Sequence, residues 1–273
     1  MKTIFTKILV AVMILTVAGA YSCKNRGESK KQKEINMVEL DALEQKIEEN
    51  VYPLPTSAEV IKKLTDMDLG YIIGSTNPPA NVRKYVESYN RSVNIGVYGA
   101  DLSYSTLYNM QQDVIDYMTA IRTLALEQNL SSIYDESLYD EIKLNFDNRD
   151  TLVKILTDAF DRTYAYMVDA GQANLAMLMV GGAWIEGMYL TLAVSESGAH
   201  LSGFESVLLE QKKSFELYEE LAKPHAEDPL VSRMLATLQP VREFYASVGT
   251  SLTLEQIEAM KKAVNSIRAE LIK

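Results

Sequence analysis

Residues 181–190 read GGAWIEGMYL and place one carboxylate, Glu186, inside a run that is otherwise almost wholly apolar. The apolar run extends over residues 173–194, which is long enough to cross a membrane. Asn174, Glu186 and three glycines make it a poor lipid-exposed span, because polar groups in hydrocarbon are costly. A helix that is apolar all round also fits the centre of a large bundle. We therefore expect a buried central helix here.

The remainder of the chain predicts an all-α fold. Its 273 residues include only 13 glycines and seven prolines, and the long segments between them carry apolar residues with the i, i+3, i+4 spacing of amphipathic helices. Long helices joined by short polar turns are typical of a multi-helix antiparallel bundle, with a helical array as the alternative. The first expected helices cover residues 35–50, a segment after the cap at 55–57, and one long segment from beyond Pro78-Pro79 to about 129, which Gly96 and Gly99 could bend. Two further helices are expected to start near 131–132 and near 148–150, the second of them ending near 170. The remaining helices are expected at 172–195, 203–222 and 228–247, followed by a last helix capped by Thr253 with Gln256.

The N-terminal residues predict export and a lipid anchor. Two lysines, a short apolar run and small residues form the pattern of a signal peptide over residues 1–22. Cys23, the single cysteine, stands where a bacterial lipobox places the residue that becomes lipidated. The alternative is an ordinary signal peptide cleaved near Ala20, which would leave a free thiol. Lipidation of Cys23 would attach the protein stably to a membrane if it carried two or more acyl chains.

The segment after the cysteine and the main domain differ in charge. Residues 23–34 are polar and predominantly basic, as in a flexible tether. Bacterial lipoproteins sent to the cell surface often carry an acidic run at this place, so by resemblance we expect the periplasmic face of the outer membrane. The first 34 residues hold seven of the 27 basic and two of the 37 acidic residues, which leaves 20 and 35, a net charge of −15, for the helical domain at 35–273. That charge argues against binding of nucleic acid and is compatible with a cationic protein partner or simply with solubility.

Glu186 and Asp101 form the constellation with the strongest chemical content. Each acid has a tyrosine three residues along the chain, and therefore on the same helical face. One interpretation is a satisfied polar core in which tyrosine hydroxyls and a cation such as Arg83, Arg91 or Arg162 meet the acids. The alternative is a polar, tyrosine-rich pocket for a small ligand between the two helices. The candidate ligand-binding residues are Tyr98, Asp101, Tyr104, Tyr108, Trp184, Glu186 and Tyr189.

The two acidic segments also resemble each other. Residues 96–107 and 181–192 share a glycine, an acid, a tyrosine, a threonine and a leucine at a constant offset of 85 residues. An ancestral duplication is one hypothesis, and it predicts that the two segments lie on facing helices related by a pseudo-twofold axis.

Patterns of catalysis and metal binding are absent from the sequence. It contains no G-x-S-x-G, no phosphate-binding loop, no H-E-x-x-H and no C-x-x-C. A di-metal bundle would need Glu-x-x-His pairs, whereas the two histidines, His200 and His225, fit surface or capping roles. We therefore expect no catalytic residues, no metal site, no cofactor and no enzymatic activity.

The motifs NIGVYGADLSY and GGAWIEGMYL resemble a group of uncharacterised all-helical lipoproteins of Bacteroidota, and the resemblance covers most of the region after the signal peptide. The resemblance implies export, acylation and a helical fold, and it brings no activity that could be assigned to residues. We expect a non-catalytic lipoprotein that binds or scaffolds an envelope protein partner. The alternative is a small-ligand binding protein with its pocket around Asp101 and Glu186.

Overall fold

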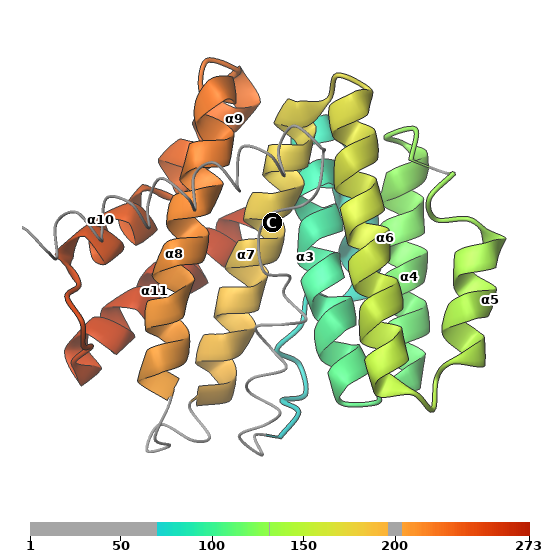
Figure 1. The fold of residues 1–273 in the computed structure, drawn as a ribbon, viewed down its shortest axis with the longest axis horizontal. Helices are drawn as coiled ribbons and strands as arrows, with labels where there is room; N and C mark the ends of the chain where they lie inside the picture. Colours follow the sequence, from blue (N-terminus) through green and yellow to red (C-terminus); the bar gives the residue numbers. More distant parts are fainter. Residues whose placement is uncertain (1–69, 131, 196–203) are drawn as a thin grey trace, which may run out of the picture. The chain divides into compact units, whose positions relative to one another are not determined.

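The computed structural model describes residues 70–130, 132–195 and 204–273, which belong to one compact unit. These residues form helices and no strand, which confirms the predicted all-α fold (Figure 1). In chain order the elements are η1 (Pro79–Lys84), α3 (Ser88–Leu107), α4 (Gln111–Leu126), α5 (Glu136–Leu144), α6 (Arg149–Asp169), α7 (Ala173–Ser195), α8 (Phe204–Ala222), η2 (Lys223–His225), α9 (Pro229–Thr237), α10 (Gln239–Ser247) and α11 (Leu254–Leu271).

Helices α3 and α7 form the centre of this unit. They contact each other more extensively than any other pair of described elements, α4 packs against α3, and α8, α9 and α11 pack against α7 (Figure 1). Because α3 and α7 are covered by neighbours, most side chains of both helices are buried. The helix Ala173–Val194 is long and apolar enough to span a membrane, but 83% of its most apolar window is buried within the protein. This burial fits the expected central helix.

Two glycines bring the backbones of α3 and α7 into direct contact. A Cβ atom at Gly96 would lie 1.9 Å from the carbonyl oxygen of Met179, and one at Gly182 would lie 2.2 Å from the carbonyl oxygen of Val93. No L side chain fits at such distances, so glycine is required at both positions. Close packing therefore offsets the cost of about 1 kcal/mol that each glycine brings to a helix interior.

The facing of α3 and α7 agrees with the duplication hypothesis, but the residue correspondence differs from the motif alignment. Gly96 meets Met179 while Gly182 meets Val93, and a shift of 86 residues relates these two contacts. The shared motif has an offset of 85 residues. A pseudo-twofold axis that exchanges the two glycine contacts therefore does not place Asp101 onto Glu186. Gly96 of α3 lies against Met179 and Ala183 of α7, and farther along both helices Asp101 of α3 lies beside Glu186 of α7. Residue numbers therefore increase in the same direction along both helices, so α3 and α7 are parallel.

Two predicted long helices are each divided in two. The segment expected to run to about 129 breaks after α3, where Asn109 has a φ of 59°. Asparagine tolerates this left-handed conformation better than most residues, and the break turns the chain from α3 into α4. The segment expected at 228–247 breaks at Leu238, because Pro240 has no N–H to continue the hydrogen bonds of α9. Gly96 and Gly99 lie within an unbroken α3.

Helix boundaries elsewhere follow the sequence signals closely. Helix α6 begins after the predicted cap at Asn148, and α7 and α8 match their expected ranges. Before α11, the N–H of Gln256 donates to Thr253 Oγ1 at 3.2 Å, and the N–H of Thr253 donates to Gln256 Oε1 at 2.9 Å, which confirms the predicted capping box. Helix α5 starts later than the predicted 131–132, because Asp135 provides its cap at the N–H of Leu138. The signal peptide, Cys23, the tether, the helices expected at 35–50 and after 55–57, and His200 lie outside the described residues.

Candidate functional site

Glu186 forms a buried ion pair with a residue of the last helix. The side chain of Glu186 has no exposed surface, and that of Arg268 on α11 is 11% exposed. Arg268 Nε donates to Glu186 Oε2 at 2.7 Å and Nη2 donates to Oε1 at 2.8 Å. Such paired hydrogen bonds between guanidinium and carboxylate are among the strongest in proteins. Helix α7 places the acid and helix α11 supplies its charge partner.

Two further contacts hold the guanidinium of Arg268 in position. Its Nη2 also donates to the carbonyl oxygen of Ser75 at 3.0 Å, and its Cζ lies 3.8 Å from the ring centroid of Tyr189. A cation over a tyrosine face is stabilised by the ring electrons. Tyr189 is three residues from Glu186 on α7, so one helical face presents both the anion and the ring.

Asp101 lies beside this ion pair and has a different environment. It is fully buried on α3, and its Oδ2 accepts a hydrogen bond from the backbone N–H of Asn77 at 3.1 Å. Its Oδ1 has no hydrogen-bond donor facing it within the part of the chain that the structure describes. The carboxyl groups of Asp101 and Glu186 are neighbours, and the charge of Glu186 acts directly on the pKa of Asp101. Two acids therefore meet one guanidinium in the core.

The pKa values of the three groups follow from this arrangement. Burial, and then the neighbouring negative charge of Glu186, raise the pKa of Asp101 well above its ordinary value of 3.8, although Arg268 and the Asn77 N–H oppose the shift. Burial also raises the pKa of Glu186, and Arg268 offsets part of that effect. Burial alone would lower the pKa of Arg268, but the charge of Glu186 raises it. Glu186 is therefore the acid that loses its proton first.

Polar side chains next to the acids hold the segment 70–78 and the C-terminal residues against α3. Asn77 Nδ2 donates to Tyr85 Oη at 3.0 Å and to Asn94 Oδ1 at 3.3 Å. Asn94 Nδ2 donates to the carbonyl oxygen of Leu271 at 2.9 Å, and Tyr85 Oη donates to that of Ile272 at 3.2 Å. One buried network thus joins α3, α7, α11 and the segment before η1.

Of the seven candidate residues, the structure brings together Asp101, Glu186 and Tyr189. Two candidate tyrosines hold the segment 70–78: Tyr98 Oη donates to the carbonyl oxygen of Pro78 at 3.1 Å, and Tyr104 Oη accepts the N–H of Ile72 at 2.8 Å. Of these two, Tyr98 also interacts with Asp101.

The other two candidates, Tyr108 and Trp184, lie in aromatic clusters. Tyr108 and Tyr71 both pack against the ring of Tyr104 with centroids 4.9 Å away. Trp184 packs against Phe215 of α8, with a centroid distance of 5.1 Å. The two acids therefore lie together, whereas Tyr104, Tyr108 and Trp184 pack against other segments of the described chain.

The prediction of which cation lies beside the acids was wrong, because that cation is Arg268. We predicted Arg83, Arg91 or Arg162, but Arg91 pairs with Glu127 at 3.5 Å and Arg162 Nε donates to the carbonyl oxygen of Asp158 at 3.3 Å. Arg268 and Asn77 were missed because neither lies near the acids in sequence. One signal was present for Arg268: it lies on the buried stripe of α11 that contains Met260, Val264, Ile267 and Leu271.

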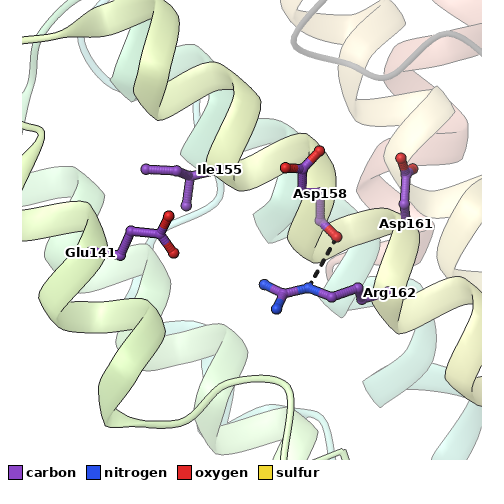
Figure 2. A pocket seen from close by; sticks show the side chains of 5 residues that line it. All are labelled: Glu141, Ile155, Asp158, Asp161 and Arg162. Atoms are coloured by element: carbon purple, nitrogen blue, oxygen red, sulfur yellow. Dashed lines mark hydrogen bonds between the residues drawn. The ribbon is translucent and has the colours of Figure 1, made fainter.

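A surface cleft lies apart from these acids, between α5 and α6 (Figure 2). It has a volume of about 450 Å³ and is lined by Glu141, Ile155, Asp158, Asp161 and Arg162. Its charged lining is predominantly acidic. Among the described residues there is no group of three or more His, Cys, Asp or Glu side chains arranged to hold a metal ion.

Comparison with protein-family models, with curated proteins and with solved structures finds no match in any of the three. The functional argument therefore depends on the residues themselves and on their geometry.

Proposed function

We propose that this chain is an exported lipoprotein, anchored through Cys23 to the periplasmic face of the outer membrane, which binds an envelope protein partner without catalysing a reaction. The observation that carries the proposal is the charge-paired contact of Glu186 with Arg268. A carboxylate whose two oxygens are already bound to a guanidinium has little capacity left for a ligand. Recognition then depends on the outer surface of the helical domain.

The surface charge indicates which partner would fit. The domain at 35–273 carries 35 acidic and 20 basic residues. A negative surface accelerates the approach of a cationic partner and repels anionic molecules. The cleft between α5 and α6 combines Glu141 and Asp158 with the apolar side chain of Ile155 (Figure 2). A lysine or arginine side chain of a partner could place its aliphatic part against Ile155 and its charge near the acids.

The small-ligand alternative would use Asp101 and Glu186 as anchors. Both acids are fully buried, and their hydrogen-bond partners among the described residues are Arg268 for Glu186 and the backbone of Asn77 for Asp101. This arrangement supports the partner-binding proposal over the ligand-binding one. A retained small molecule in native mass spectrometry of the protein purified from its own envelope would favour the alternative.

The proposal is tested by crosslinking in the intact envelope, with identification and quantification of the crosslinked partner. The double variant Glu141→Gln, Asp158→Asn removes two charges at the cleft. The control Glu216→Gln, Glu258→Gln removes two exposed charges on α8 and α11. At low salt we expect the crosslinked fraction to fall several-fold in the cleft variant and to stay unchanged in the control variant. At raised salt we expect the crosslinked fraction to fall for both variants, because salt screens charge interactions. Unchanged crosslinking of a partner in both variants and at raised salt would contradict charge-based recognition. Failure to crosslink any protein would contradict the proposed function.

A further inference from the structure

Two acids and one base lie together in the core of the helical unit. Asp101 and Glu186 have no exposed surface, and Arg268 is the cation that interacts most strongly with both. If both carboxyl groups were ionised, the region would hold two negative charges against one positive charge. An uncompensated buried charge is strongly unfavourable, and a buried acid in this position takes up a proton instead.

The hydrogen bonds identify which oxygen carries that proton. Both oxygens of Glu186 already accept hydrogens from Arg268. Oδ2 of Asp101 accepts the N–H of Asn77, so that oxygen acts as an acceptor. Oδ1 of Asp101 has no donor facing it among the residues that the structure describes, and the neighbouring acid whose charge acts on this carboxyl group is Glu186. An O–H at Oδ1 would turn this unfavourable contact between two acceptors into a hydrogen bond.

We infer that Asp101 and Glu186 share one proton in the folded protein, carried on Oδ1 of Asp101 and donated to the carboxylate of Glu186. The remaining negative charge on Glu186 is balanced by Arg268. With this proton in place, the three side chains carry no net charge and the carboxyl oxygens of both acids have hydrogen-bond partners. The pair is thus a proton-binding site inside the core.

Within the described ranges 70–130, 132–195 and 204–273, the groups that act on the pair include no second cation. Tyr85, Tyr98 of α3 and Tyr117 of α4 interact with Asp101, and burial raises the pKa of each, so the three phenols stay neutral at physiological pH. Tyr189 of α7 faces Arg268 with its ring. The segment 70–78 contributes the uncharged groups of Ser75 and Asn77. The charge of the site therefore changes with the proton on Asp101.

The shared proton connects the stability of the fold to pH. The folded protein holds a proton at Asp101 above pH 3.8, the ordinary value for aspartate, where the unfolded chain releases it. Since the folded-state pKa is raised, the stabilisation is complete below the unfolded value and is lost as the pH rises through the folded value. Between pH 3.8 and the folded-state pKa of Asp101, this group alone increases the unfolding constant about tenfold per pH unit.

The test compares the full chain in nonionic detergent with its Asp101→Asn variant by urea unfolding at pH 5, 6 and 7. Asparagine donates and accepts hydrogen bonds at the same places as the protonated acid, but it does not titrate. We expect the unfolding constant of the wild type, divided by that of the variant, to increase up to about tenfold per pH unit. Asp140→Asn, which removes an exposed acid on α5, is the control and should give a constant ratio. A ratio that is also constant for Asp101→Asn would overturn the inference.

Infrared spectroscopy gives a second measurement that needs no variant. A protonated carboxyl group has a carbonyl stretch distinct from that of a carboxylate. At pH 6 we expect one such band that shifts when aspartate is labelled with ¹³C and does not shift when glutamate is labelled. Absence of the band, or a shift with glutamate labelling alone, would contradict the placement of the proton on Asp101.

Discussion

Glu186 and Asp101 are both fully buried acids on the paired central helices, but their partners make them chemically different. Glu186 receives paired hydrogen bonds from the guanidinium of Arg268, whereas Asp101 receives one backbone N–H and faces another acid. The first arrangement stabilises a charge and the second opposes it. Burial alone therefore does not decide the charge state of an acid; the donors on neighbouring segments decide it.

The largest effect is expected from Glu186→Gln. The substitution removes the counter-charge of a buried guanidinium, and breaking a buried pair in this way costs about 3 to 5 kcal/mol. The measurement is the free energy of unfolding in urea at pH 7. In Glu186→Gln, ionised Asp101 would compensate in part. The double variant Glu186→Gln, Asp101→Asn should therefore be less stable than the sum of the two single effects predicts, since Asp101→Asn alone is stabilising at this pH. A loss below about 1 kcal/mol for Glu186→Gln, within the range of an exposed ion pair, would show that the pair with Arg268 does not stabilise the fold.

The close approach of α3 and α7, which forces both acids into the core, is tested by glycine substitutions. Gly96→Ala and Gly182→Ala each place a Cβ within 2.2 Å of a backbone oxygen, so the helices must separate. Overpacking of this kind costs about 1 to 3 kcal/mol or more. Gly99→Ala is the matched control, because its Cβ would lie 3.6 Å from Phe160 at ordinary contact distance. Thermal unfolding should show losses for the first two variants and none for the control; equal effects would argue against the backbone contact.

A smaller effect is expected from Tyr189→Leu. The ring of Tyr189 lies 3.8 Å from the guanidinium carbon of Arg268, and a cation over a ring contributes roughly 0.5 to 2 kcal/mol. Leucine keeps much of the apolar contact and removes the ring electrons. Chemical denaturation of Tyr189→Leu in the Glu186→Gln background separates the two contributions. If Tyr189→Leu were neutral in the wild type, the ring would have no role in holding the cation.

The smallest effect is expected from Asp101→Asn at pH 3.5, where Asp101 holds its proton in most folded and in most unfolded wild-type chains. The change should alter the free energy of unfolding by less than about 1 kcal/mol, because the side-chain hydrogen bonds are preserved. The variant should become the more stable protein as the pH rises, since the unfolded wild-type chain releases this proton above pH 3.8 and the variant has none to release. Unfolding measured at pH 3.5 and pH 7 checks both statements. A loss at pH 3.5 as large as that of Glu186→Gln would remove the distinction between the two acids.

The sequence predicted the fold where local chemistry determines the structure. Helix α7 was identified from its uninterrupted apolar run, and the start of α11 from Thr253 and Gln256, whose capping box depends on residues three positions apart. The breaks at Asn109 and Leu238 were missed. Asn109 adopts a positive φ that many asparagines do not adopt, and Pro240 is also compatible with a kinked helix.

The candidate site was predictable only in part. The residues Asp101 and Glu186 were recognisable because acids in apolar helical segments require partners. Their partners were not, since Arg268 is 82 residues from Glu186 and Asn77 is 24 residues from Asp101. Spacing within one helix gives no information about the segments that pack against it. Arg268 lies on the apolar stripe of α11, and a cation on a buried helical face requires an anionic partner just as a buried acid requires a cation.

The central claim, that two neighbouring buried acids hold different charge states, is tested most directly by ¹³C NMR. Side-chain carboxyl carbons of labelled aspartate and glutamate report their own protonation, and Asp101→Asn and Glu186→Gln assign the two signals. We predict that at pH 6 the signal of Glu186 is that of a carboxylate and the signal of Asp101 is that of a carboxylic acid. Two carboxylates at that pH, or a proton found on Glu186 instead of Asp101, would contradict the account.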